Sequence, residues 1–337
     1  MYKKIFTLLM ILSLTVFTGG CGGGGSAQNQ SSGNKLVIYT SMKESLIGGI
    51  IEGFKKQNPG VTIDYQSAGA GKIMAKLEAE RQSGQMLADI IWTSEVPDFY
   101  DMKSKEMLEQ YQPTNFTEVL NPFKDYDGSF TAARLGTLGI VINTDRVSVA
   151  PKEWEDLATD PVYKDSFGIA DPALSGTALM SVALLEKQFG WEYFERLREN
   201  GAIKSKGSGR VIDDTATGDL VACLGVDYIT AAKIDKGSPL QLVYPKELLM
   251  VPSPVAILKD GPNTETAKKF VDYILSQEAQ QMIANSGTVP VRRDIQMPEK
   301  YNLPAPEVAL DTGIKINYSD VMAQKEEIIQ KFSELFR

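Results

Sequence analysis

Residues 36–92 alternate between two kinds of apolar pattern, and this alternation restricts the fold more than any other feature of the sequence. Leu36–Tyr39, Val61–Tyr65 and Ala88–Trp92 are short, apolar and rich in β-branched residues, as strands are. Residues 43–57 carry large apolar side chains at helical spacing, and a second helix is expected from about Lys72. The order strand, helix, strand, helix, strand predicts an α/β domain with a mostly parallel sheet.

A second set of elements of the same kind follows. Strands are expected at Arg134–Asn143, Phe167–Ala170 and Pro252–Leu258, with helices between them and a long helix at the C-terminus. The pattern predicts two α/β units, roughly 36–140 and 145–250. Open α/β sheets bind ligands at the carboxyl ends of their strands. Two such units facing each other would therefore form a cleft that closes by hinge motion around a ligand.

The N-terminus has the order of a secretory signal peptide. Two lysines precede an apolar run over residues 5–17, which is shorter than the roughly 20 residues of a membrane-spanning helix. Small residues and then Cys21 follow, an order that resembles the lipobox of bacterial lipoproteins. We expect residues 1–20 to be removed and Cys21 to carry lipid. Residues 21–34 would form a flexible tether, which would hold the exported protein on the outer face of the cytoplasmic membrane.

The composition argues against several classes of function. The chain has 43 acidic and 35 basic residues and a net charge of −8, whereas nucleic-acid binding needs clustered Lys and Arg. It has no histidine, which removes Ser-His-Asp and Cys-His catalysis and histidine-containing zinc sites. No P-loop, dinucleotide fingerprint or nucleophile-elbow motif occurs. We therefore expect a binding protein with no catalytic residue, no cofactor and no nucleic-acid partner.

Four segments that follow expected strands carry small or polar residues, which makes them candidates for ligand binding. They comprise Thr40, Ser41, Gly69, Ser94, Glu95, Ser175, Gly176 and Thr177. The last three open an expected helix, whose unpaired N–H groups and dipole favour an anion. The alternative is purely structural: Ser175 would cap its own helix, and Gly69 would form a turn.

The order and spacing of these segments resemble a known family. Similar segments are LVIYTS (36–41), SAGAGKIMAKLEAE (67–80), ADIIWTSE (88–95), GTLGIVIN (136–143) and DPALSGTALMSVALL (171–185). They look like the ferric-iron and organophosphate branch of the periplasmic solute-binding proteins of ABC importers, over about residues 36 to 295. The resemblance implies a two-lobed α/β periplasmic-binding-protein fold of type II. It also implies a monomer that delivers a small solute to a membrane permease and its ATPase.

The resemblance also implies how the chain divides between the lobes. One lobe would comprise residues 36–142 plus 256–300, and the other residues 143–255 plus 301–337. A protein of this kind can alternatively serve as the ligand sensor of a membrane histidine kinase, and the sequence does not separate the two roles.

Members of this branch differ in their ligand. Iron-binding members usually carry a Tyr-Tyr pair where this chain has Asp227-Tyr228, and often a histidine near Lys43. Members that bind phosphorylated or phosphonate solutes are more similar, since they carry an aspartate matched by Asp227 and a glutamate matched by Glu247. Ferric iron held by oxygens of Tyr228, Glu95 and these two acids is the alternative. For each acid, a solvated surface carboxylate is the further alternative.

The phosphorylated-solute interpretation assigns a role to each end of the ligand. It implies that phosphoryl oxygens are held by Thr40, Ser41, Ser175, Gly176 and Thr177. Asp227 and Glu247 would accept hydrogen bonds from hydroxyl groups of the solute or pair with an amine. Positive charge could come from Lys43, Lys72, Arg134 and Arg210, which the sequence does not rank.

Overall fold

The computed structural model describes residues 35–337, so the predictions on the signal peptide, Cys21 and the tether lie outside the described residues. Within 35–337, no helix combines the length and apolar character needed to cross a membrane. The strands are β1 (Lys35–Thr40), β2 (Thr62–Ser67), β3 (Ile90–Trp92), β4 (Thr131–Asn143), β5 (Phe167–Ala170), β6 (Ile203–Ser205), β7 (Ala222–Val226), β8 (Leu240–Val243) and β9 (Leu249–Ile257).

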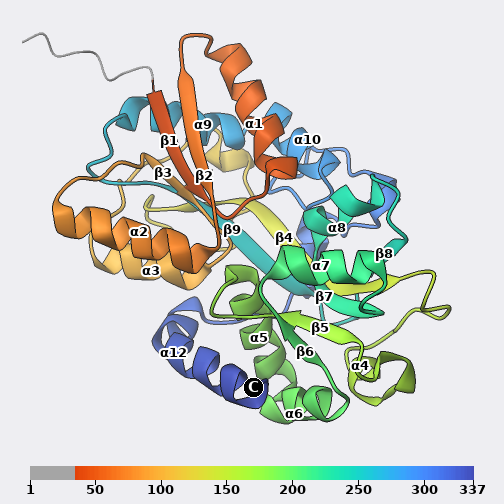
Figure 1. Ribbon diagram of the computed structural model, residues 1–337. Helices are drawn as coiled ribbons and strands as arrows, with labels where there is room; N and C mark the ends of the chain where they lie inside the picture. Colours follow the sequence, from red (N-terminus) through yellow and green to blue (C-terminus); the bar gives the residue numbers. More distant parts are fainter. Residues whose placement is uncertain (1–34) are drawn as a thin grey trace, which may run out of the picture. The chain divides into compact units, whose positions relative to one another are not determined.

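Helices connect most of these strands (Figure 1). They are α1 (Glu44–Gln57), α2 (Ala70–Ser83), α3 (Val96–Ser104), α4 (Asp156–Thr159), α5 (Gly176–Phe189), α6 (Trp191–Glu199), α7 (Ser208–Thr217), α8 (Asp227–Ile234), α9 (Thr264–Ile274), α10 (Gln277–Asn285), α11 (Pro306–Thr312) and α12 (Tyr318–Leu335). Short 3-10 turns lie at Phe116–Glu118, Pro161–Tyr163 and Glu299–Tyr301.

The described strands form one mixed sheet in the order β2-β1-β3-β9-β4-β7-β5-β6, with β8 paired to β4. At one end β1 pairs in parallel with β2 and β3, and at the other β5 pairs in parallel with β6 and β7. Between these two parallel groups, β9 and β4 run antiparallel to each other and to their outer neighbours (Figure 1). The sheet thus contains two α/β groups joined by two long strands.

The strand β4 belongs to both groups. Its first part pairs with β9, from Thr131 to Leu138, and its last part pairs with β7 and β8. All of its residues are buried, polar ones included, as expected for a central strand covered on both faces. Arg134 lies in the first part, next to Ser253 of β9, so its long side chain starts between the two groups.

The core confirms the helical periodicity read from the sequence. Helix α1 buries Leu46, Ile50 and Phe54, and the Phe54 ring packs edge-on at 5.2 Å against Phe270 of α9. Cys223, in β7, is fully buried, and this burial raises the pKa of its thiol to about 12. Asn263 occupies the N-cap position of α9, but its side-chain amide donates to Asp89 instead of capping the helix.

The C-terminal helix α12 packs against elements of both groups. It contacts α3, which follows β3, and also α5 and α6, which follow β5. Phe332 stacks on Phe336 at 4.5 Å and meets Phe194 of α6 edge-on at 6.0 Å. Lys325 pairs with Glu95 and with Asp98 at the start of α3. The helix therefore links the start of α3 to the α5–α6 pair.

Candidate functional site

A cleft of about 270 Å³ lies where the loops of the two strand groups meet. Its lining comes from the loops after β1, β2, β3, β5, β6 and β7 and from β4. The lining residues are Ser41, Met42, Lys43, Ala68, Gly69, Ala70, Ser94, Arg134, Leu174, Ser175, Gly176, Thr177, Lys206, Gly207, Ser208, Gly209, Arg210, Val226, Tyr228 and Ile229. Strand-to-helix transitions from both groups therefore converge on one space.

Five of the described helices begin in this cleft. Their N-cap residues, all in its lining, are Lys43 for α1, Gly69 for α2, Ser175 for α5, Gly207 for α7 and Val226 for α8. The first N–H groups of a helix have no partner within the helix, and the helix dipole places partial positive charge there. Five such ends around one cleft favour an anionic ligand.

Three hydroxyl groups lie together at the starts of α5 and α7. Ser175 Oγ is 3.0 Å from Thr177 Oγ1 and 2.9 Å from Ser208 Oγ, and the last two are 3.0 Å apart. Ser175 Oγ also accepts the backbone N–H of Ala178 at 3.3 Å, as an N-cap does. Each hydroxyl has one donor that can rotate. In the structure the three hydroxyls hydrogen-bond to one another, and their protons could rotate toward an acceptor in the cleft.

The charged side chains of the cleft lining are all basic. They are Lys43, Arg134, Lys206 and Arg210, and no acidic residue is among the described residues of the lining. Lys206 and Arg210 are exposed at the rim, whereas Arg134 is 1 % exposed. Arg134 pairs with Asp227 and Arg210 with Asp214, so the net positive charge at the cleft comes from Lys43 and Lys206. In a chain with a net charge of −8, this local positive charge favours an anion over other small solutes.

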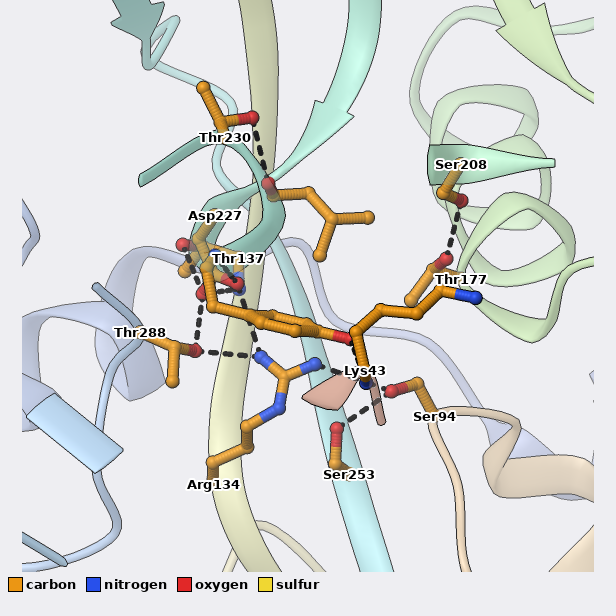
Figure 2. Close-up of polar contacts among 12 residues, drawn as sticks. Lys43, Ser94, Arg134, Thr137, Thr177, Ser208, Asp227, Thr230, Ser253 and Thr288 are labelled. Atoms are coloured by element: carbon orange, nitrogen blue, oxygen red, sulfur yellow. Dashed lines mark hydrogen bonds and ion pairs between the residues drawn. The ribbon is translucent and has the colours of Figure 1, made fainter. Parts of the chain in front are cut away.

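Arg134 is held by contacts from both strand groups. Its Nη1 donates to Thr288 Oγ1 at 2.6 Å and to Asp227 Oδ1 at 3.2 Å, and its Nη2 donates to Ser94 Oγ at 3.3 Å. The guanidinium carbon lies 4.9 Å from the centre of the Tyr228 ring. Figure 2 shows the guanidinium between the Asp227–Thr288 pair on one side and Ser94 on the other. Its Nε–H is buried and has no hydrogen-bond partner.

Tyr228 keeps its phenol proton. Burial raises its pKa, although the nearby Arg134 acts in the opposite direction. Its hydroxyl accepts the backbone N–H of Lys43 at 3.1 Å, a contact between the start of α8 and the start of α1. A phenolate is what a ferric ion would need from this residue. Among residues 35–337, moreover, no three His, Cys, Asp or Glu side chains come together in a group that could hold a metal ion.

The structure places seven of the sequence-predicted site residues in the cleft lining and four outside it. Those in the lining are Ser41, Gly69, Ser94, Ser175, Gly176, Thr177 and Tyr228. Those outside it are Thr40, Glu95, Asp227 and Glu247. Of the four unranked basic residues, Lys43, Arg134 and Arg210 line the cleft and Lys72 does not.

The residues outside the lining have other contacts. The Thr40 hydroxyl donates to the Trp92 carbonyl at 2.8 Å, which ties the end of β1 to β3. Glu95 is buried beside Gly176 and pairs with Lys325. The Glu247 carbonyl accepts the indole N–H of Trp154 at 2.9 Å, and its carboxylate does not line the cleft.

Two glycines allow close backbone approach at the cleft. A Cβ on Gly69 would lie 2.5 Å from the carbonyl oxygen of Leu174, and one on Gly176 would lie 2.6 Å from Cβ of Glu95. These distances are far below normal carbon contacts. Glycine at position 69 is therefore required for the contact between the loop before α2 and the loop before α5.

Sequence reasoning missed the segment Lys206–Gly209. It follows β6 and opens α7, and it contributes Ser208 and Lys206 to the cleft. Its Gly-Ser-Gly run before a helix has the same character as the Ser-Gly-Thr run at 175–177 and could have signalled a fifth binding loop. The three residues of β6 are too few to show a strand pattern, which is why the transition was not recognised.

Comparison with known proteins identifies the family of the chain. The family model described as "Bacterial extracellular solute-binding protein" matches residues 85–318. The chain belongs to this family. A periplasmic protein of Salmonella typhimurium, whose name proposes 2-aminoethylphosphonate as ligand, is 25% identical to this solute-binding protein over 292 residues. The match covers 82% of this chain and 83% of the relative.

Solved structures show the same fold. The periplasmic binding protein AfuA from Actinobacillus pleuropneumoniae, solved with exogenous fructose-6-phosphate bound, has a TM-score of 0.79 and 25% identity, covering 91% of this chain and 99% of that one. Iron-bound HitA from Pseudomonas aeruginosa has a TM-score of 0.73 at 21% identity, covering 90% and 99%. The predicted family and the two-lobed type II periplasmic-binding-protein fold are thereby confirmed. Proteins of this kind bind small solutes for transport systems and work outside the cytoplasm.

Proposed function

We propose that this solute-binding protein captures a small phosphorylated or phosphonate solute in the cleft and delivers it to an ABC permease with its ATPase, without catalysing a reaction. One observation carries the proposal: five helix N-termini and three clustered hydroxyls surround the cleft, and the charged side chains among its described lining residues are all basic. A phosphoryl group presents several oxygens, each of which accepts more than one hydrogen bond. It therefore uses such a set of donors better than a carboxylate does.

The phosphoryl group would lie against the starts of α5 and α7. There Ser175, Thr177 and Ser208 would turn their hydroxyl protons toward its oxygens, and backbone N–H groups of both helices would add further donors. Lys43 comes from the other strand group, and its Cε would be 3.9 Å from a Cβ on Gly209. Figure 2 shows its side chain extending toward Thr177. The ligand would thus be held by both groups.

The lobes would comprise residues 36–142 plus 256–300 and residues 143–255 plus 301–337, with β4 and β9 as the hinge strands. Two contacts would form when the lobes close: the Lys43 N–H with the Tyr228 hydroxyl, and the loop at Gly69 with the Leu174 carbonyl. Solute would bind between the open lobes, and closure would present a single surface to the permease. The lipid on Cys21 would keep the protein near that permease.

The test is binding of defined ligands to the unlipidated protein by calorimetry and thermal unfolding. Fructose-6-phosphate, 3-phosphoglycerate, inorganic phosphate and ferric citrate are the probes. A ligand at a hundred times its Kd stabilises the folded protein by about 2.7 kcal/mol. We expect stabilisation by at least one organic phosphate. Stabilisation by ferric citrate alone would overturn the proposal in favour of an iron carrier, and failure of these four probes together with 2-hydroxyethylphosphonate and 2-aminoethylphosphonate would also overturn it.

The hydroxyl cluster has a matched control within the chain. Ser276 caps α10 as Ser175 caps α5, with the same 3.3 Å bond from a backbone N–H, but it lies outside the cleft lining. Ser175→Ala and Ser276→Ala should each lower the free energy of unfolding by about 1 kcal/mol. Only Ser175→Ala should weaken ligand binding, by about tenfold or more, since it removes a donor to an anion. Equal binding by the two variants would contradict the placement of the phosphoryl group.

A further inference from the structure

Asp227, the acid that could recognise a cationic group on the ligand, is already paired with Arg134. Asp227 is fully buried and does not line the cleft. Its oxygens accept the backbone N–H groups of Thr137 at 2.8 Å and Tyr228 at 2.7 Å, the Thr288 hydroxyl, and Nη1 of Arg134. A carboxylate has about four acceptor positions, so these donors use its capacity.

Arg134 separates that acid from the ligand. The guanidinium lines the cleft, whereas the carboxylate that it pairs with does not. It also lies over the Tyr228 ring, the aromatic face that could otherwise attract an ammonium group. What Arg134 presents to a solute is a positively charged guanidinium with N–H donors and no acceptor atom. Its charge and its donors both favour an acceptor atom on the ligand.

The remaining walls offer no substitute for the missing negative charge. Apart from its basic residues, the cleft can present two kinds of side chain to the non-phosphoryl end of a solute, and neither carries negative charge. They are apolar groups of Met42, Leu174, Val226 and Ile229 and hydroxyl groups of Ser41, Ser94 and Tyr228. An ammonium group placed there would lose water, face Arg134 and find no carboxylate among the described lining residues. Burying a cation without a partner is strongly unfavourable.

From this geometry we infer that Arg134 determines ligand specificity: by holding Asp227 it excludes solutes with a cationic tail and admits phosphorylated or phosphonate solutes whose tail is neutral. The inference rests on the proposed function of the cleft. It separates this chain from its Salmonella typhimurium relative, whose name proposes 2-aminoethylphosphonate, a ligand with an amine. Asp227 is then a positioning residue, which fixes the guanidinium without touching the solute.

Three phosphonates of the same chain length test the inference by calorimetry at pH 7. They are 2-aminoethylphosphonate, 2-hydroxyethylphosphonate and propylphosphonate, which end in an ammonium, a hydroxyl and a methyl group. For the native sequence we expect the hydroxyl compound to bind at least about tenfold more tightly than the amine. The methyl compound controls for size. An amine that binds as tightly as the hydroxyl compound, or more tightly, would overturn the inference and leave the proposed function intact.

Two variants test whether Arg134 causes the preference for the hydroxyl compound over the amine. Arg134→Gln removes the charge beside Asp227, so it should shift the ratio of the two affinities toward the amine by about tenfold. The double variant Arg134→Gln with Asp227→Asn should lose that shift. An unchanged ratio in a folded Arg134→Gln protein would refute the role of Arg134. If this variant does not fold, the inference is judged from the native protein alone, by the ratio of its affinities for the hydroxyl and amine compounds. If no phosphonate, organic phosphate or inorganic phosphate binds, the proposed function falls and the inference with it.

Discussion

Replacing Lys325 with methionine should destabilise the protein in a pH-dependent way. Lys325 Nζ contacts an oxygen of Glu95 and lies 2.7 Å from Asp98 Oδ1. The two carboxylate side chains are only 4 % and 6 % exposed, and the lysine side chain is 24 % exposed. The second oxygen of Asp98 has no hydrogen-bond partner. Methionine keeps most of the volume of the lysine stem but leaves two buried carboxylates without their cation.

The size of the effect follows from this burial. Removing one partner of a buried ion pair costs about 3–5 kcal/mol. Since Lys325 is partly exposed, we expect the lower value, about 3 kcal/mol at pH 8. Burial, assisted by the neighbouring Asp98, raises the pKa of Glu95 to about 7, against the opposing effect of Lys325. Without the lysine this pKa rises further, so at pH 5.5 Glu95 is neutral. The loss should then fall below about 2 kcal/mol, because each pKa unit corresponds to about 1.4 kcal/mol.

Urea unfolding at pH 8 and pH 5.5 measures this difference. Lys55→Met is the control, because Lys55 makes an exposed ion pair with Glu52 at 3.0 Å and should change stability by no more than about 0.5 kcal/mol at either pH. A loss for Lys325→Met below about 1 kcal/mol, or an equal loss at both pH values, would refute the account of this cluster.

Three further predictions concern single residues. The folded-state pKa of Glu95 lies above its ordinary value of 4.5, so the stability that this group contributes is full at low pH and is lost as pH rises from about 4.5 to about 7. Glu95→Gln should therefore make the urea midpoint of unfolding depend less on pH over that range. Gly176→Ala should lower stability by about 1–3 kcal/mol through overlap with Glu95, whereas Gly49→Ala, in open space on α1, should raise it by about 0.5–1 kcal/mol in the same urea assay. Lys206→Met should weaken organic phosphate binding and reduce its dependence on salt, which calorimetry at two ionic strengths would show.

Local periodicity was enough to predict most of the fold. Helix α1 was expected at 43–57 and spans Glu44–Gln57, because its apolar residues repeat at helical spacing and pack on α9 and α10. The two long central strands were expected as well. The sequence shows no regular pattern over residues 95–130, yet this segment contains α3, Val96–Ser104, which is short and has a proline in its first turn.

The candidate site was predictable only where a local rule applies. Ser175, with a glycine after it, marks a helix start, and the structure places it in the cleft. The orientation of Asp227 depends on Arg134, which is 93 residues earlier in the chain. The environment of Asp98 likewise depends on Lys325, which is 227 residues away. No rule of sequence spacing links such pairs. The order of strands in the sheet brings Arg134 close to Asp227, and the packing of α12 on α3 brings Lys325 close to Asp98.

The position of α12 has a practical consequence for producing this protein in recombinant form. The match to the family ends at residue 318, which is the first residue of this helix. A shortened chain designed on that boundary would lose Phe332, which is completely buried, and would uncover the acidic start of α3 beside the solute cleft. Such a chain would tend to aggregate, and a weak binding result from it would say little about the solute. An affinity tag is better attached after the exposed Arg337, with the helix intact.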